Sequence, residues 1–297
     1  MRMKSRATSL LIYLPVAALL GLLRLLPRRG VRALGRSCGR LVYRVDKKHR
    51  EVAAANLNAA FNDTISEEDK AAIIHSAFLH FGTVFFDFFH LANQSPAKRD
   101  RHIQIEGEEH LHKAVDQGRG ALLFTAHFGL WEIAPTPINP IIPMSVVARP
   151  LDNMFLEKTL LKLRGRLGSK VISKFQAGRE ILKALRGQES VAILIDQNVL
   201  AQEAIFVDFF GKSAATTPSL AMFHLRTGAP IIPVFCVPSA SRGYRVQVFP
   251  PVQVKRTGDR DRDVKNITQA CTKIIEDQIR RKPEYWFWFH DRWKTRP

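Results

Sequence analysis

From about residue 103 onward, short apolar runs alternate with amphipathic segments of helical length. The apolar runs predict strands at 120–125, 145–148, 191–195, 230–235 and 244–249. The segments between them predict helices at 107–117, 153–168, 177–187 and 216–227. This alternation indicates an α/β fold with a mixed, largely parallel sheet flanked by helices. In such sheets, reactive side chains gather where the parallel strands end.

The residues before the first strand have a helical pattern. Segment 47–95 reads as helix, and Ser66 followed by three acidic residues resembles a helix start. The second half of this segment is rich in phenylalanine, at positions 78, 81, 85, 86, 88 and 89. We interpret this aromatic stripe as core packing rather than as a groove for an acyl chain.

An uncharged stretch, 7–23, lies close to the amino terminus. As a helix its 17 residues would reach about 26 Å, at the short edge of what spans a bilayer. The basic segment that follows, from Arg24 to Arg29, lacks the small residues of a signal-peptide cleavage site. We therefore expect a retained membrane anchor, which either crosses the bilayer or lies in its surface.

Positive charge is concentrated beside this anchor. The chain has 45 Lys and Arg against 27 Asp and Glu, a net charge of +18, and residues 1–50 hold 13 of the basic side chains with one acid, Asp46. Arginines recur at every fourth position from Arg28 to Arg44 and would form one helical stripe, although three glycines, 30, 35 and 39, weaken the helix prediction. Such a stripe is either a solvated face or a surface for anionic lipid headgroups, and its place after the anchor favours lipid.

These features predict two domains: a membrane anchor with a basic interfacial segment at 1–50, and a catalytic domain at 51–297. The latter divides into a helical lead-in, 51–102, and an α/β core, 103–297. The three cysteines are scattered without metal-ligand or disulfide spacing, so we expect no metal site and a cytoplasmic, reducing setting. No nucleic-acid-binding module is recognisable.

The first predicted strand of the core runs into His127, and Glu132 follows five residues later. On one continuous helix the two side chains would point about 140° apart. They can meet only if His127 lies in a loop and Glu132 in the first turns of the next helix, which Gly129 permits by allowing a tight turn. Glu132 would then bond one imidazole nitrogen and leave the other to accept a proton. A buried histidine with an incidental acid is the alternative interpretation.

The segment His127–Glu132 resembles the H-x4-D/E motif of glycerolipid acyltransferases, in the form found in bacterial lipid A biosynthesis (late, or secondary) acyltransferases. Further segments resemble this family in the expected order, so that the likeness runs from about residue 10 to the end: 105–111, 148–153, 194–197, 207–216 and 283–294. The resemblance implies acyl transfer from an acyl carrier protein or coenzyme A thioester to a hydroxyl of a lipid A precursor, with no other cofactor. It also implies a place at the cytoplasmic face of the inner membrane.

In this chemistry His127 would act as general base on the acceptor hydroxyl, and Glu132 would hold its tautomer. No cysteine or serine lies close to the motif in the sequence, so we expect direct attack on the thioester without an acyl-enzyme. Backbone N–H groups after His127 are candidate donors to the oxyanion.

Four further residues are candidates for substrate binding. Arg149 could clamp a phosphate or carboxylate, while the neighbouring Asp152 and Asn153 are expected to cap the next helix. Asp196 and Gln197, at a strand end, could position the acceptor or support Arg149. Lys212 could contact phosphate from a loop. Each has an ordinary structural alternative: a surface ion pair, a strand-end hydrogen bond or a solvated lysine.

Other functions remain open at this point. The same chemistry could act on another anionic phospholipid or glycolipid, such as a mannosylated inositol lipid. A catalytically inactive, lipid-binding membrane scaffold belongs to another class, but the intact His127, Glu132 and Arg149 argue against it. An esterase would place a G-x-S-x-G turn after a strand, and none of the predicted strands ends in one. The aromatic and basic carboxyl end, from Trp286 onward, fits either a membrane interface or ordinary core packing.

Overall fold

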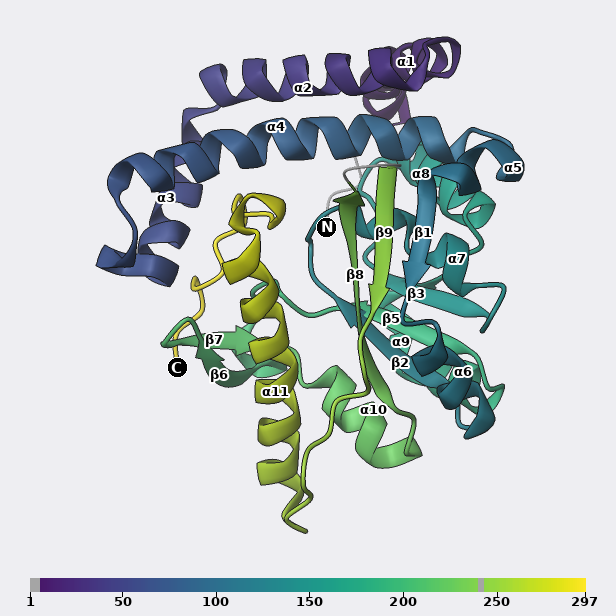
Figure 1. The fold of residues 1–297 in the computed structure, drawn as a ribbon, viewed down its shortest axis with the longest axis vertical. Helices are drawn as coiled ribbons and strands as arrows, with labels where there is room; N and C mark the ends of the chain where they lie inside the picture. The colour runs from purple at the N-terminus through teal and green to yellow at the C-terminus, as the bar shows by residue number, and fades with distance from the viewer. Residues whose placement is uncertain (1–5, 240–242) are drawn as a thin grey trace.

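The computed structural model describes residues 6–239 and 243–297, and its centre is a seven-stranded sheet (Figure 1). The strand order is β1-β9-β8-β2-β5-β3-β4, and every neighbouring pair is parallel except β8 and β9. The strands are β1 (Ile103–Glu106), β2 (Ala121–Thr125), β3 (Met144–Ala148), β4 (Lys170–Ser173), β5 (Ser190–Leu194), β8 (Ile231–Ser239) and β9 (Gly243–Val248). The mixed, largely parallel α/β sheet expected from the sequence is confirmed.

Helices cover both faces of this sheet, so its central strands are buried on both sides. Leu122 and Phe124 of β2 pack in one hydrophobic cluster with α9 (Ala177–Arg186), α10 (Ser219–Thr227) and α11 (Arg260–Arg281). Ala121 and Leu123 face the other cluster, with α6 (Glu109–Asp116), α7 (Pro135–Ile138) and α8 (Met154–Arg166). Burial on both faces explains why the central strands appear in the sequence as continuous apolar runs.

Several elements were not anticipated from the pattern. Strands β1 and β4 have only four residues each, and helix α11 buries polar residues among its apolar ones. A separate antiparallel hairpin, β6 (Ile205–Phe209) and β7 (Lys212–Thr216), packs beside α11. Short helical turns complete the chain: α5 (Pro96–Arg99), η1 (Asn62–Thr64), η2 (Asp100–His102), η3 (Trp131–Ile133), η4 (Lys174–Gln176), η5 (Ala201–Glu203) and η6 (Pro283–Tyr285).

Four helices precede the sheet: α1 (Arg6–Leu25), α2 (Arg28–Val45), α3 (Lys47–Phe61) and α4 (Glu67–Ala92). Ser66 caps α4 as predicted, by accepting a hydrogen bond from the backbone of Asp69. Helices α2 and α4 lie side by side along one side of the molecule, opposite α10 (Figure 1). By length and composition both α1 and α4 could cross a membrane, but α4 is half buried as a core helix whereas α1 is mostly exposed.

Glycines bring α2 and α4 into close backbone contact. A Cβ added at Gly35 would lie 2.6 Å from the carbonyl oxygen of Gly82, and one added at Gly82 would overlap the carbonyl oxygen of Gly35. These glycines therefore permit helix packing rather than interrupt the helix. Residues 35–39 also spell G-x-S-x-G, but they lie inside α2 and not at a strand-to-helix turn, so they form no nucleophile elbow.

A buried ion pair connects helices α2 and α4 to the sheet. Asp87 of α4 is fully buried and accepts hydrogen bonds from Arg28 at 2.7 and 2.8 Å and from the hydroxyl of Tyr244 in β9 at 2.8 Å. Arg28 therefore points inward, away from the outer face where the stripe was expected. Later arginines of the stripe remain exposed on α2: Arg36, Arg40 and Arg44.

Candidate active site

His127 and Asp196 meet at the carboxyl ends of two neighbouring strands. The register pairs Thr125 of β2 with Leu194 of β5, so the side chains two residues further along each strand lie across from one another. The imidazole Nδ1 is 2.9 Å from Asp196 Oδ1, and the backbone N–H of His127 donates to Asp196 Oδ2 at 3.0 Å. Asp196 thus contacts both the ring and the main chain of His127.

The Asp196 carboxylate is held in a dry environment with several donors. The residue is 3% exposed, and the indole N–H of Trp286 donates to Oδ2 at 2.8 Å. Burial by itself raises the pKa of this carboxyl, but the charge of His127 and the hydrogen bonds from His127 and Trp286 outweigh it and bring the pKa below its usual value. Asp196 is therefore an anion at neutral pH, and His127 Nδ1 carries the proton that it accepts.

The other imidazole nitrogen, Nε2, belongs to a side chain that is partly exposed. The ring lies edge-on to Trp131, with centroids 5.0 Å apart, and tilted against Phe287 at 6.3 Å. The side chain is 24% exposed, and no described residue forms a hydrogen bond with Nε2. With Nδ1–H bonded to Asp196, the lone pair of Nε2 is available to a substrate proton.

Glu132 has a different partner from the one expected. His127 does lie in the loop and Glu132 in the following turn, η3, but no hydrogen bond or ion pair joins them within the described part of the chain. Glu132 instead makes two bonds with Arg164 of α8, at 2.6 and 2.9 Å. Asp196 contacts the ring because β5 neighbours β2, a pairing between segments 69 residues apart that local spacing does not contain.

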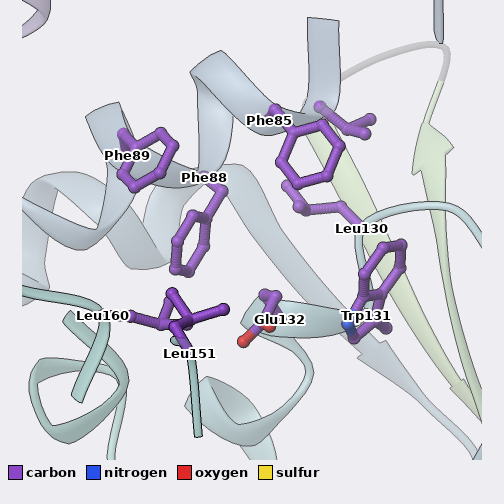
Figure 2. A pocket seen from close by; sticks show the side chains of 9 residues that line it. Phe85, Phe88, Phe89, Leu130, Trp131, Glu132, Leu151 and Leu160 are labelled. Carbon is purple, nitrogen blue, oxygen red and sulfur yellow. The ribbon is translucent and has the colours of Figure 1, made fainter. Parts of the chain in front are cut away.

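An apolar cavity of about 230 Å³ lies next to Trp131 and Glu132. Figure 2 shows Phe85, Phe88 and Phe89 of α4 opposite Leu151 and Leu160, with Leu130, Trp131 and Glu132 completing the wall. The interpretation of the phenylalanine stripe as core is correct for Phe78, Phe81 and Phe88, which are buried. Phe88 also lines this cavity, together with Phe85 and Phe89, whereas Phe86 packs against apolar residues of α1 and α2. Its one charged wall residue, Glu132, is paired with Arg164.

The backbone N–H groups directly after His127 are already engaged. Phe128 N donates to Ala126 O at 2.7 Å, Gly129 N to Tyr285 O at 2.9 Å and Leu130 N to Cys236 O at 2.9 Å. These groups therefore do not form the oxyanion site that the sequence suggested. Arg164 is a cation tied to the motif through its ion pair with Glu132.

Arg149 follows β3 at the same edge of the sheet, one strand beyond Asp196. Its side chain is 60% exposed and lies 3.3 Å from Asp152. Asn153 caps α8 as expected, accepting bonds from Phe155 N and Leu156 N, and its amide also donates to Ser9 O of α1. The segment that carries Arg149 is thereby tied to the amino-terminal helix.

The other expected substrate-binding residues are more loosely placed. Gln197 is half-buried directly after Asp196. Lys212 is exposed at the start of β7, in the separate hairpin, and no described acid pairs with it. Asn198 bonds His290 and Thr295, so it holds the carboxyl end rather than facing a substrate. Within residues 6–239 and 243–297, no group of three or more His, Cys, Asp and Glu side chains could hold a metal ion.

Two contributors to the site were missed at the sequence level, Arg164 and Trp286. Arg164 lies in the interior of a predicted helix with no local signal to distinguish it from neighbouring basic residues. Trp286 belongs to the aromatic carboxyl end, which was expected at a membrane interface or in the core. Trp286 and Trp288 are 2% and 0% exposed, so the core interpretation is the correct one for both.

Comparison with known proteins identifies the family of the chain. The chain is 28% identical to the lipid A biosynthesis palmitoleoyltransferase of Escherichia coli K12, over 89% of this chain and 85% of that protein. It is also 28% identical to the lauroyltransferase of the same strain, over 92% and 88%, and 24% identical to a phosphatidylinositol mannoside acyltransferase of Mycolicibacterium smegmatis, over 74% and 72%. Residues 2–295 match the family described as bacterial lipid A biosynthesis acyltransferase. The chain therefore belongs to the bacterial lipid A biosynthesis acyltransferase family.

Proposed function

We propose that this acyltransferase moves a fatty acyl group from a carrier thioester to a hydroxyl of a lipid A precursor, with His127 as general base. The observation that carries the mechanism is the 2.9 Å contact between His127 Nδ1 and the buried Asp196 carboxylate. It fixes one tautomer of the imidazole and directs Nε2 toward the substrate side. Membership of the family supports the reaction class.

In the proposed reaction, Nε2 of His127 removes the proton of the acceptor hydroxyl as its oxygen attacks the thioester carbonyl. The Asp196 carboxylate stabilises the imidazolium that forms. The tetrahedral intermediate then expels the thiolate, which takes the proton from His127 and leaves as the free thiol of the carrier. The acyl group forms its new bond directly with the acceptor oxygen, and the imidazole is ready for another cycle.

Glu132 has a separate task in this proposal: it holds Arg164 beside the reaction centre. Burial lowers the pKa of the Arg164 guanidinium, but the bonds and charge of Glu132 reverse this, so the net direction is upward and the charge is secure. A fixed cation can stabilise the oxyanion of the intermediate or a phosphate of the acceptor. This assigns the H-x4-E glutamate a positioning role, with Asp196 as the partner of the base.

The apolar cavity is a suitable site for the acyl chain. Its phenylalanine and leucine walls exclude water, and it adjoins Trp131, which packs against the imidazole. A chain lying there would present its thioester carbonyl close to His127. Exclusion of water also favours transfer to the acceptor over hydrolysis.

The amino-terminal helices supply a membrane surface in the same proposal. Helix α1 exposes apolar side chains along its length: Leu10, Leu11, Ile12, Leu14, Leu22 and Leu25. Helix α2 exposes Arg36, Arg40 and Arg44, which can lie against anionic headgroups. We place the protein at the inner membrane with its catalytic domain on the cytoplasmic side, where acyl carrier protein and coenzyme A thioesters are made.

The test uses purified full-length protein in detergent with lauroyl and palmitoleoyl thioesters of carrier protein or coenzyme A. A Kdo-bearing lipid A precursor is one acceptor and a phosphatidylinositol mannoside is another. Mass spectrometry measures whether the acceptor gains an acyl mass. We expect a gain on the lipid A precursor that H127A abolishes, because the variant has no base for the hydroxyl.

The matched control is H112A, which removes an exposed histidine from α6, away from the sheet edge that carries the site. It should retain full transfer. If only the phosphatidylinositol mannoside gains an acyl mass, the proposed acceptor is wrong but the proposed reaction stands. Binding of lipid without transfer to any acceptor would refute the proposed enzyme and favour a lipid-binding scaffold.

A further inference from the structure

The carboxyl-terminal segment after α11 forms backbone hydrogen bonds with the loop that carries His127, called the catalytic loop below. Gly129 N donates to Tyr285 O and Phe287 N donates to His127 O, both at 2.9 Å, so that Phe128 and Trp286 pair as an antiparallel bridge. The main chain at the candidate base and directly after it is therefore fixed by a segment more than 150 residues away in the sequence. This backbone pairing sets where Trp286 can point.

The indole of Trp286 reaches the carboxylate that orients the base. Its Nε1–H donates to Asp196 Oδ2 at 2.8 Å, and the same oxygen accepts the backbone N–H of His127. Two donors on Oδ2 restrict rotation of the carboxylate, so Oδ1 is held toward His127 Nδ1. A phenylalanine would fill the same apolar space, and hence packing alone does not explain why an indole N–H is aimed at this oxygen.

We propose that Trp286 is a positioning residue for the acyl transfer: it locks the Asp196 carboxylate in the rotamer that holds the His127 tautomer. The proposal rests on the function proposed above. Without the indole donor, the carboxylate can turn away and His127 loses its fixed orientation in part of the molecules. The effect belongs to the chemical step, because Trp286 is 2% exposed and lies behind the carboxylate rather than against a substrate.

The rest of the segment is anchored independently, which keeps the indole in place. The side-chain amide of Asn56 in α3 donates to Trp288 O and His290 O, each at 2.7 Å. The guanidinium of Arg292 is buried and donates to Ala215 O of β7 at 2.6 Å. Changing the indole therefore leaves the path of the segment supported by bonds that do not involve Trp286.

Trp288 provides a matched control. It is fully buried, lies edge-to-face with Trp286 at 4.5 Å, and donates its indole N–H to Pro283 O rather than to Asp196. W286F and W288F thus remove the same group from the same core, but only W286F takes a donor from the carboxylate. A second variant replaces Trp286 with 3-benzothienylalanine, whose sulfur removes the N–H while the ring keeps its shape.

The experiment measures kcat and KM of the full-length protein for the acyl thioester and the lipid acceptor. For W286F and for the benzothienyl variant we expect kcat to fall about 10- to 100-fold with both KM values unchanged, as for the loss of a hydrogen bond to a charged group. W288F should stay within about threefold of wild type. In a D196N background, W286F should cost nothing further, because the indole acts only through that carboxylate.

A spectroscopic measurement separates this inference from the proposed function. The Nδ1–H proton of His127 in its bond to Asp196 gives a downfield proton resonance, which should broaden or move in W286F and persist in W288F. An unchanged resonance, or a kcat loss equal in the two variants, would overturn the role of Trp286. Wild-type kcat in the benzothienyl variant would also overturn the role of Trp286. A wild-type protein that transfers no acyl group, yet shows the expected change in resonance, would refute the proposed function alone.

Discussion

The candidate active site and the α2–α4 interface are both built from segments far apart in the sequence, but they are held together differently. At the site, buried donors converge on one charge: the Asp196 carboxylate receives hydrogen bonds from His127 and Trp286. Between α2 and α4, Gly35 and Gly82 bring the two backbones into contact because neither has a side chain there. The candidate active site depends on the charge and hydrogen bonds of a carboxylate, whereas the helix interface depends on the absence of side chains at two glycines.

This difference predicts which property each region controls. A substitution at the site that keeps shape and hydrogen bonds but removes charge should stop catalysis and leave the fold nearly intact. A substitution between the helices that adds a single methyl group should weaken the fold and leave the catalytic groups unchanged. Measuring kcat and unfolding free energy on the same variants tests this separation.

The largest effect is expected for D196N. The amide oxygen can still accept from Trp286 and the His127 backbone, but its NH2 group would face Nδ1 and favour the tautomer with the proton on Nε2. That nitrogen could then no longer accept a proton from the hydroxyl. By analogy with the same substitution in serine protease triads, kcat should fall about 10³- to 10⁴-fold, with a loss of unfolding free energy of no more than about 1 kcal/mol.

The H127A/D196N double variant sharpens this prediction. Because the two residues act as a unit, the double variant should be about as slow as H127A alone. Losses that multiply would contradict the assignment of Asp196 as the partner of His127. Chemical denaturation of each variant, followed by circular dichroism in detergent, measures the accompanying change in stability.

A smaller effect, on stability, is expected for G82A. The new Cβ would overlap the carbonyl oxygen of Gly35, so α2 must move away from α4 at a cost of about 2 kcal/mol. The kcat of the folded fraction should stay near the wild-type value. The control is G178A in α9, where an added Cβ meets nothing within 4 Å and helix propensity should stabilise by up to about 1 kcal/mol. Equal stability of the two variants would contradict close packing by Gly82.

The two regions also differ in how far the sequence predicted them. Burial on both faces makes strands such as β2 and β5 continuous apolar runs, and these were located nearly to the residue because the signal is local. His127 was predicted in the correct loop but was paired with Glu132, because spacing along the chain does not reveal that β5 neighbours β2. Asp196 was expected to position the acceptor or support Arg149, because its pairing with His127 depends on strand order.

In the helical layer, local propensity misdirected the interpretation. Gly35 and Gly39 reduce helix propensity, and only the facing helix α4 shows why they are there. Arg28 fits the period of the exposed stripe, but Asp87 and Tyr244 turn it inward. In both cases the residues that explain the position lie in another helix or strand, so they cannot be inferred from residues 28–45 alone.

The smallest expected effect concerns His80, which belongs to both regions. It lies on α4 and stacks on Tyr285 at 4.6 Å, and the carbonyl oxygen of Tyr285 accepts a hydrogen bond from Gly129 in the loop of the candidate base. Burial lowers the pKa of His80 to about 3, and the nearby backbone of Gly129 opposes this shift only in part. From pH 6.5 downward the unfolded chain therefore binds a proton that the folded protein does not, and stability is lost.

For a pKa near 6.5 in the unfolded chain, the loss of unfolding free energy from His80 at pH 5.5 is about 1.4 kcal/mol. H80N removes the titration and keeps a polar side chain of similar size, so between pH 7.5 and 5.5 the variant should lose less unfolding free energy than wild type by that amount. H112N, which changes an exposed histidine, should follow the wild-type curve. Parallel curves for H80N and wild type would mean that His80 accepts a proton in the folded protein, and that α4 does not hold the catalytic loop through a neutral imidazole.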